Sequence, residues 1–114
     1  MLPSIVIEVR EYLAADGNSP YRKWFDNLNA QAAAKVAMGV TRMAQENFSN
    51  AKGVASGLQE YVIDFGPGYR IYFGKDGERL VILLGGGTKK RQQEDIRRAQ
   101  ALWLDYKRRK KEEK

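Results

Sequence analysis

The sequence contains neither cysteine nor histidine. Their absence excludes disulfides, thiol nucleophiles, zinc sites built on those two residues and proton transfer by imidazole. A metal site made only of carboxylates is left open, but the sequence contains no Asp/Glu cluster that suggests one. Any catalysis must therefore use Arg, Lys, Tyr, Ser, Thr or carboxylate side chains, and we expect neither a metal nor another cofactor.

Long apolar runs are also missing. The longest one covers only residues 80–84, far too few to span a bilayer. The first residues, Met1-Leu2-Pro3-Ser4, lack the basic head and apolar stretch of a secretory signal. A length of 114 residues suits one domain. We expect a single cytoplasmic domain over residues 1–114, without membrane contact, whose basic end at 107–114 frays.

Positive charge is concentrated at one end of the chain. Residues 1–88 contain nine Lys/Arg and nine Asp/Glu, whereas residues 89–114 contain eleven and five. The whole net charge of +6 therefore lies in the last 26 residues. Such asymmetry favours an anionic partner, of which nucleic acid is the commonest. The alternative is a solvated basic tail that only aids solubility.

Hydrophobic spacing and turn residues predict the elements. Residues 4–11 are β-branched and partly alternating, which indicates a strand. Ser19-Pro20 and Asn29 are typical helix starts, so we expect a helical hairpin over residues 20–47. Residues 48–57 read as a loop, followed by strands at 59–65, 69–74 and 79–84 and a helix from about 92 to 109. Residues 85–88 should form an open, irregular backbone segment between the last strand and that helix.

The predicted fold class is therefore α+β, in the order strand, helix, helix, three strands, helix. The three later strands should form an antiparallel meander, and the first strand should join the small twisted sheet separately. The helical hairpin should pack on one face of the sheet, because both carry apolar stripes that need cover. On the strand at 69–74, Tyr69, Ile71 and Phe73 should face one way, and Arg70 and Tyr72 the other.

Four features carry candidate chemistry. Arg70 lies on a strand among aromatic residues, where its planar fork suits phosphate oxygens; the alternative is a surface or salt-bridged arginine. The stretch Gly85-Gly86-Gly87-Thr88-Lys89-Lys90-Arg91 brings backbone amides and cations to an anion, or is only a flexible basic connector. Tyrosines 61, 69 and 72 either stack on bases or pack on the sheet. The basic run at 107–111 suits an RNA backbone without reading its sequence.

These residues resemble a known family. The stretch from Gly57-Leu58-Gln59-Glu60 through Gly66-Pro67-Gly68-Tyr69-Arg70 to Gly85-Gly86-Gly87-Thr88-Lys89-Lys90 is similar to the phage-derived, HigB-like branch of the RelE/ParE toxins. Trp24-Phe25-Asp26-Asn27-Leu28, Gln93, Asp95-Ile96 and Ala99 extend the likeness over about residues 5–106. The resemblance implies a RelE-like fold and a toxin of a type II toxin–antitoxin system that cuts mRNA on the ribosome. It also implies a helix-turn-helix, HigA-like antitoxin as partner.

The resemblance also implies roles for particular residues. Arg70 would stabilise the phosphate, Lys89 or Lys90 would hold it or protonate the leaving oxygen, and Tyr61 and Asp95 are candidates for acid or base. The side chains expected to contact RNA are Lys52, Tyr72, Arg91, Arg97, Arg98, Lys107 and Arg108.

Two departures from the family pattern keep other functions open. Val62 stands where the family usually has arginine, and Thr88 stands where aspartate is usual. Each removes a polar group, so cleavage could be weak, differently organised or lost. The alternatives are a ParE-like toxin that poisons DNA gyrase without catalysis, and a catalytically impaired domain that only binds RNA or an antitoxin. ParE-like proteins share the fold, so the fold does not decide between them.

Overall fold

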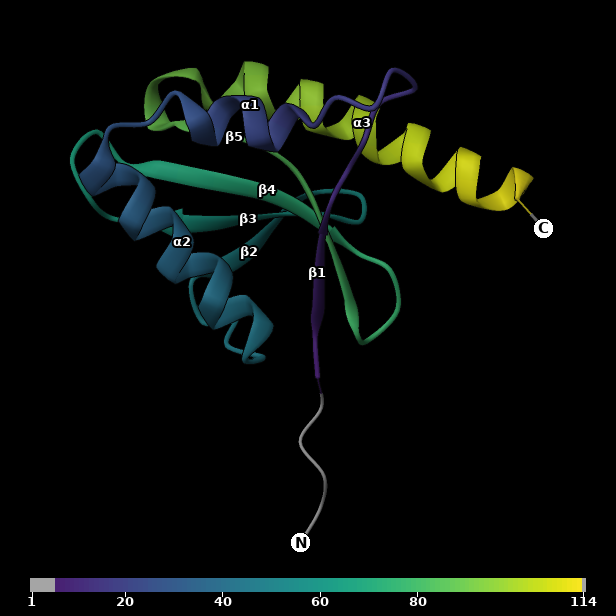
Figure 1. Ribbon diagram of the computed structural model, residues 1–114, viewed down its shortest axis with the longest axis horizontal. Coiled ribbons are helices and arrows are strands. Elements are labelled where there is room, and N and C mark those ends of the chain that lie inside the picture. Colours follow the sequence, from purple (N-terminus) through teal and green to yellow (C-terminus); the bar gives the residue numbers. More distant parts are fainter. Residues whose placement is uncertain (1–5, 114) are drawn as a thin grey trace, which may run out of the picture.

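The computed structural model describes residues 6–113. The elements along the chain are β1 (Glu8–Glu11), α1 (Pro20–Asp26), α2 (Ala30–Ala44), β2 (Ala51–Ala55), β3 (Leu58–Ile63), β4 (Tyr69–Lys75), β5 (Leu80–Thr88), a 3-10 turn η1 (Lys89–Arg91) and α3 (Gln92–Glu112). The strands described form one mixed five-stranded sheet in the order β1-β5-β4-β3-β2 (Figure 1). The fold is therefore α+β, as predicted.

Strand pairing confirms that the first strand stands apart from the meander. β2, β3, β4 and β5 pair antiparallel in succession. β1 pairs parallel with β5, with Glu8 opposite Leu80 and Glu11 opposite Leu83. β5 therefore lies between β1 and β4, and its residues 81–84 are buried, which is typical of the continuous apolar run of a central strand.

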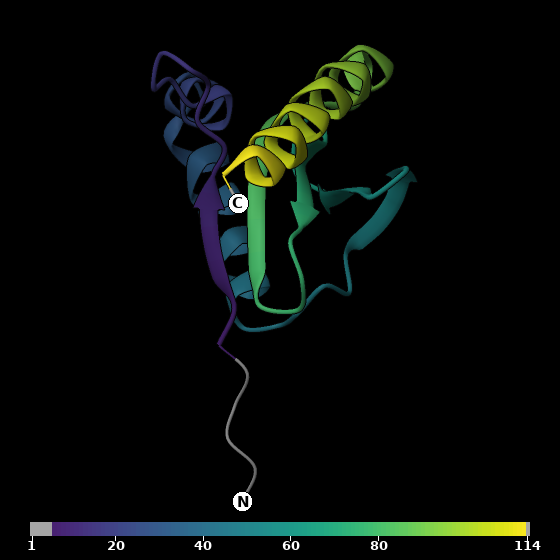
Figure 2. The same cartoon turned by 90° about the vertical axis from the view of Figure 1, so that its right-hand side faces the viewer.

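Helices cover both faces of the sheet. Figure 2 shows α1 and α2 on one side and α3 on the other. Tyr69, Ile71 and Phe73 of β4 belong to the core beneath α1 and α2, whereas Tyr72 packs with Ala99 and Trp103 of α3. The predicted alternation on this strand is confirmed. Arg70, on the same side as Tyr72, is directed toward the α3 layer.

The two predicted helix starts are confirmed. The Ser19 hydroxyl accepts a hydrogen bond from the Arg22 N–H at 3.0 Å, and Pro20 occupies the first turn. The Asn29 side chain accepts from the Ala32 N–H at 2.9 Å. α2 ends at Ala44, earlier than predicted, and Glu46 adopts a left-handed φ of 64° just beyond it.

Several predicted boundaries are wrong. Residues 51–55 form β2 rather than loop. Lys, Gly and Ala are weak strand formers, but they suit β2, which lies at the edge of the described sheet and pairs with β3. β1 begins at Glu8, and residues 4 and 5 lie outside the described part of the chain. α3 continues to Glu112, so the basic run at 107–111 is helical and not frayed.

The glycine stretch differs most from expectation, because residues 85–88 continue strand β5 and do not form an irregular segment after it. A Cβ atom on Gly86 would lie 2.3 Å from the Trp24 ring, and one on Gly87 would lie 2.0 Å from the Asp95 Oδ2. The α1 and α3 layers thus rest directly on the backbone of the strand. These two glycines allow a close approach from both faces and are not a flexible connector.

No helix in the described part of the chain combines the length and apolar character that crossing a membrane requires.

Candidate functional site

A buried ion pair lies at the centre of the face covered by α3. The Arg70 Nε of β4 lies 3.3 Å from the Glu60 Oε2 of β3. Glu60 is fully buried and Arg70 is only 8% exposed. In the strand register Glu60 faces Tyr72, and Arg70 faces Val62 on one side and Gly87 on the other. Arg70 is therefore the salt-bridged arginine that the sequence left open, and the sheet fixes its position.

Glu60 gathers donors from three elements. The Gln92 Nε2, at the start of α3, donates to both carboxylate oxygens at 3.1 and 3.0 Å. The Lys52 Nζ of β2 lies 3.4 Å from the Glu60 Oε1. Because a buried carboxylate needs such partners, Glu60 orients two cations and the first turn of α3 together. One carboxylate between two cations leaves a net positive charge at this point.

Lys89 lies beside the same group. Its N–H donates to the Gly68 carbonyl at 3.1 Å. A methyl group placed on Gly68 would lie 3.8 Å from the Arg70 Nη1 and also 3.8 Å from the Lys89 Cβ. Arg70 and Lys89 thus flank one turn, and exposed Lys90 follows. We call Lys52, Glu60, Arg70, Lys89 and Gln92 the polar cluster.

Asp95 borders the polar cluster from the first turn of α3. It is 9% exposed and lies against Gly87, the register partner of Arg70. Burial raises the pKa of the Asp95 carboxyl, and the positive charges of Arg98 and Arg91 oppose that shift. The structure therefore brings Asp95 close to Arg70, with a carboxyl group that holds its proton more tightly than usual.

The raised pKa of Asp95 leads to a prediction about stability. A carboxyl group whose pKa is raised in the folded state binds its proton more tightly in the folded protein. Its contribution to the free energy of unfolding therefore becomes less favourable as pH rises through and above its pKa in the unfolded chain, about 4. Asp95→Asn should therefore unfold at a higher denaturant concentration than wild type at pH 7. This advantage should shrink as pH falls toward 4. Urea titrations at several pH values measure it, and an advantage that grows on acidification would contradict the assignment.

Two tyrosines predicted at the site behave differently. Tyr61 is 1% exposed and belongs to the core beneath α1 and α2, on the face opposite Arg70. The prediction that it joins the site is wrong, because neighbouring residues of β3 point to opposite faces. Tyr72 is on the correct face, but it is also 1% exposed. Burial raises the pKa of its hydroxyl, and its ring is not available to stack on a base.

The remaining basic residues lie on η1 and α3. Arg91 pairs with Glu94 at 3.2 Å, and an Arg98 nitrogen is 3.9 Å from Asp95. Arg97 is exposed on the same helix. Further along, the Lys107 ammonium lies 5.7 Å from the centre of the Trp103 ring. Arg108 pairs with Asp105 and Glu112. We call these exposed basic residues of η1 and α3 the basic strip.

Sequence reasoning missed Glu60 and Gln92 as members of the site. A signal for Glu60 was present, since the sequence places this carboxylate in the middle of an apolar strand that precedes the strand of a lone arginine. Gln92 gave no signal, because its role depends on where α3 begins above the sheet. No group of three or more potential metal-ligating side chains comes together within residues 6–113.

The fold and the polar cluster define an α+β protein with a five-stranded mixed sheet and a buried, lysine-flanked Glu–Arg pair. No family model matches the chain. Over 83 residues it is 40% identical to an uncharacterized protein of Haemophilus influenzae, an alignment that covers 72% of this chain and 84% of the relative. The chain belongs to the same family as that protein.

Proposed function

We propose that the chain is a RelE-like toxin of the HigB-like branch, part of a type II toxin–antitoxin system, and that it cuts mRNA on the ribosome. The observation that carries the proposal is the polar cluster: Arg70 is held by the sheet beside Lys89, with Lys52 nearby. The resemblance of the sequence to the HigB-like branch supports the proposal. Ribosomes and mRNA would be its targets in the cytoplasm, and a helix-turn-helix, HigA-like antitoxin would neutralise it.

The chemistry needs no metal. The RNA 2′-OH attacks the adjacent phosphorus in line, the bond to the 5′ oxygen breaks, and the products are a cyclic phosphate and a free 5′-OH. Arg70 would stabilise the charge that develops on the phosphate oxygens. Lys89 or Lys90 would protonate the departing oxygen, and Asp95, which lies against Gly87, would take part in proton transfer at the 2′-OH.

One observation favours a second candidate. Glu60 already neutralises part of the Arg70 charge, and the register partner of Arg70 on β3 is the apolar residue Val62. A cluster with this arrangement suits a protein that binds without catalysis, as in a ParE-like gyrase poison or a catalytically impaired RNA-binding domain. The basic strip on η1 and α3 serves either function.

The decisive experiment incubates the purified full-length chain with ribosomes programmed with a defined mRNA. The proposal expects new fragments with 5′-OH and cyclic phosphate ends that require both the ribosome and the chain. Gyrase supercoiling is measured in parallel. Inhibition of supercoiling without RNA fragments would replace the proposal with the ParE-like function. If neither RNA fragments nor inhibition of supercoiling is observed, only a binding role is left.

The basic strip predicts salt-dependent binding to RNA or ribosomes. Each lysine or arginine that contacts a single-stranded phosphate contributes about 0.7 to the slope of log affinity against log salt. Lys107→Ala combined with Arg108→Ala should therefore lower that slope by up to about 1.4. Lys35→Ala combined with Arg42→Ala on α2 is a matched control on the opposite face. Equal losses in both double variants would contradict a localised strip.

A further inference from the structure

A groove of about 1210 Å³ lies between α1 and α3, and the last half of β5 forms its floor. Figure 2 shows these helices on either side of the end of β5. Lys23 and Trp24 line the α1 wall, and Arg91 and Arg98 line the opposite one. The groove borders the polar cluster but extends away from it toward α1.

The floor of the groove is an unpaired strand edge. β1 ends at Glu11, opposite Leu83, and the Tyr12 N–H donates to the Leu83 carbonyl at 2.9 Å. The chain then turns away, closing a small loop in which the Ala14 N–H donates to the Asn18 carbonyl. Among the described strands, residues 84–88 of β5 thus have a neighbour only on the β4 side.

The antiparallel ladder fixes which backbone groups face the groove. The Lys89 N–H donates to the Gly68 carbonyl. Because residues of a strand alternate in the direction of their hydrogen bonds, Gly85 and Gly87 bond toward β4, and the N–H and C=O of Gly86 and the N–H of Thr88 face the open edge. The Thr88 carbonyl is instead the first acceptor of the 3-10 turn η1. Among the turn, loop and cap hydrogen bonds of residues 6–113, none engages the Gly86 N–H and C=O or the Thr88 N–H.

Charged side chains and proline are missing from the edge at residues 85–87, and a bulge interrupts the pairing with β4 only at Leu84. Proteins commonly shield exposed edges with charged side chains, proline or bulges. Gly85, Gly86 and Gly87 have no side chains, and the Trp24 ring and the Asp95 carboxylate cover the two faces of the strand, not its edge. A Cβ atom on Gly85 would meet nothing within 4 Å. Residues 84–88 themselves line the groove, so the edge is reachable from it.

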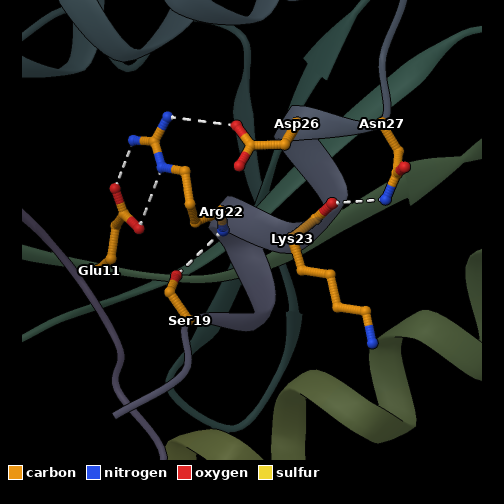
Figure 3. A network of polar contacts seen from close by, with 6 residues as sticks. All are labelled: Glu11, Ser19, Arg22, Lys23, Asp26 and Asn27. Atoms are coloured by element: carbon orange, nitrogen blue, oxygen red, sulfur yellow. Dashed lines mark hydrogen bonds and ion pairs between the residues drawn. The ribbon is translucent and has the colours of Figure 1, made fainter.

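The groove also offers polar groups without partners. Figure 3 shows Arg22 held by Glu11 and Asp26, while the Lys23 side chain extends away from this network. Among the described residues that line the groove, Lys23 is the cation without a carboxylate within 4.0 Å. Tyr72, 1% exposed, reaches the floor, and its buried hydroxyl has no hydrogen-bond partner within residues 6–113.

We infer that this groove binds an extended peptide segment of a partner protein, which adds a short strand to β5 and places an acidic side chain opposite Lys23. Alternating N–H and C=O groups match another polypeptide strand. They match a nucleic acid poorly, because the carbonyl of Gly86 would face phosphate oxygens. The inference rests on the strand edge alone and holds whether or not the chain cuts RNA.

A display library of capped nine-residue peptides, presented to the intact chain, tests the inference. Binders should be rich in β-branched residues and carry Asp or Glu at one recurring position. Methylation of alternate backbone nitrogens of a selected peptide should abolish binding, whereas methylation of the intervening ones should be tolerated. Lys23→Glu should weaken binding roughly fivefold or more, and Lys35→Glu on α2 should not. NMR should show the Gly86 and Thr88 amides shifting on titration.

Three outcomes would overturn the inference. The first is a library that yields no binder above background. The second is a methylation scan without alternation, which would indicate a side-chain pocket instead of strand addition. The third is a single-stranded RNA oligonucleotide that shifts the Gly86 and Thr88 amides and displaces the peptide, which would assign the groove to nucleic acid. None of these measurements involves ribosomes, so they do not depend on cleavage.

Discussion

Arg70→Ala should reduce ribosome-dependent mRNA cleavage by about 100- to 1000-fold, the usual effect of losing one well-placed donor to a developing negative charge. Arg70 is fixed on β4 by its ion pair with Glu60, and its Nη1 is directed toward the turn beside Lys89. No other guanidinium of the described chain ion-pairs with Glu60. Quantification of 5′-OH fragments in single-turnover reactions on programmed ribosomes measures the effect.

The same substitution should also destabilise the fold, which needs a control. Removing Arg70 leaves the fully buried Glu60 with Gln92 and Lys52 as partners, and breaking a buried pair commonly costs about 3–5 kcal/mol. A double variant, Arg70→Leu with Glu60→Leu, removes both charges and should recover most of that stability. Cleavage that returned with the stability of this double variant would show that Arg70 acts only in the fold.

Arg70→Lys separates charge from geometry. A lysine keeps the ion pair with Glu60, but it cannot offer two parallel donors to a phosphate. Stability should therefore stay close to wild type while cleavage falls. Full activity of this variant would mean that a point charge at position 70 is sufficient.

The parts of the fold that depend on local chemistry were predictable from the sequence. Ser19 and Asn29 start helices because their side chains satisfy free N–H groups, whatever the remainder of the chain does. Alternation on β4 placed Tyr69 and Arg70 on opposite faces. β2 was missed because an exposed edge strand does not need strand-forming residues, and its pairing with β3 is decided by tertiary contacts.

The candidate site was only partly predictable, for a related reason. Arg70 and Lys89 come together because both adjoin the turn at Gly68, and this follows from a hairpin that the sequence indicates. Tyr61 could have been assigned correctly, since centring the turn between β3 and β4 places it opposite Ile71, in the core. The Glu60–Gln92 contact was not predictable, because the sequence does not say where α3 crosses the sheet.

Gly86→Ala should destabilise the protein by about 1–3 kcal/mol, the usual cost of overpacking. In most strands this change would be mildly favourable, since alanine loses less conformational freedom on folding than glycine. Here the added methyl group would lie 2.3 Å from two atoms of the Trp24 ring. That ring also belongs to the packing of the core beneath α1 and α2, so α1 must shift or Trp24 must leave its place on β5.

Gly85→Ala is the matched control for this prediction. Gly85 is the neighbouring residue of the same strand, and its added methyl group would meet nothing within 4 Å. Chemical denaturation should show a lower midpoint for Gly86→Ala and an unchanged or higher one for Gly85→Ala. Combining Gly86→Ala with Trp24→Leu should make the cost of the added methyl group smaller than in the wild-type background, because the clashing ring atoms are gone. Equal stability of the two single variants would mean that Trp24 does not pack on the strand. In that case α1 would not line the peptide groove as described.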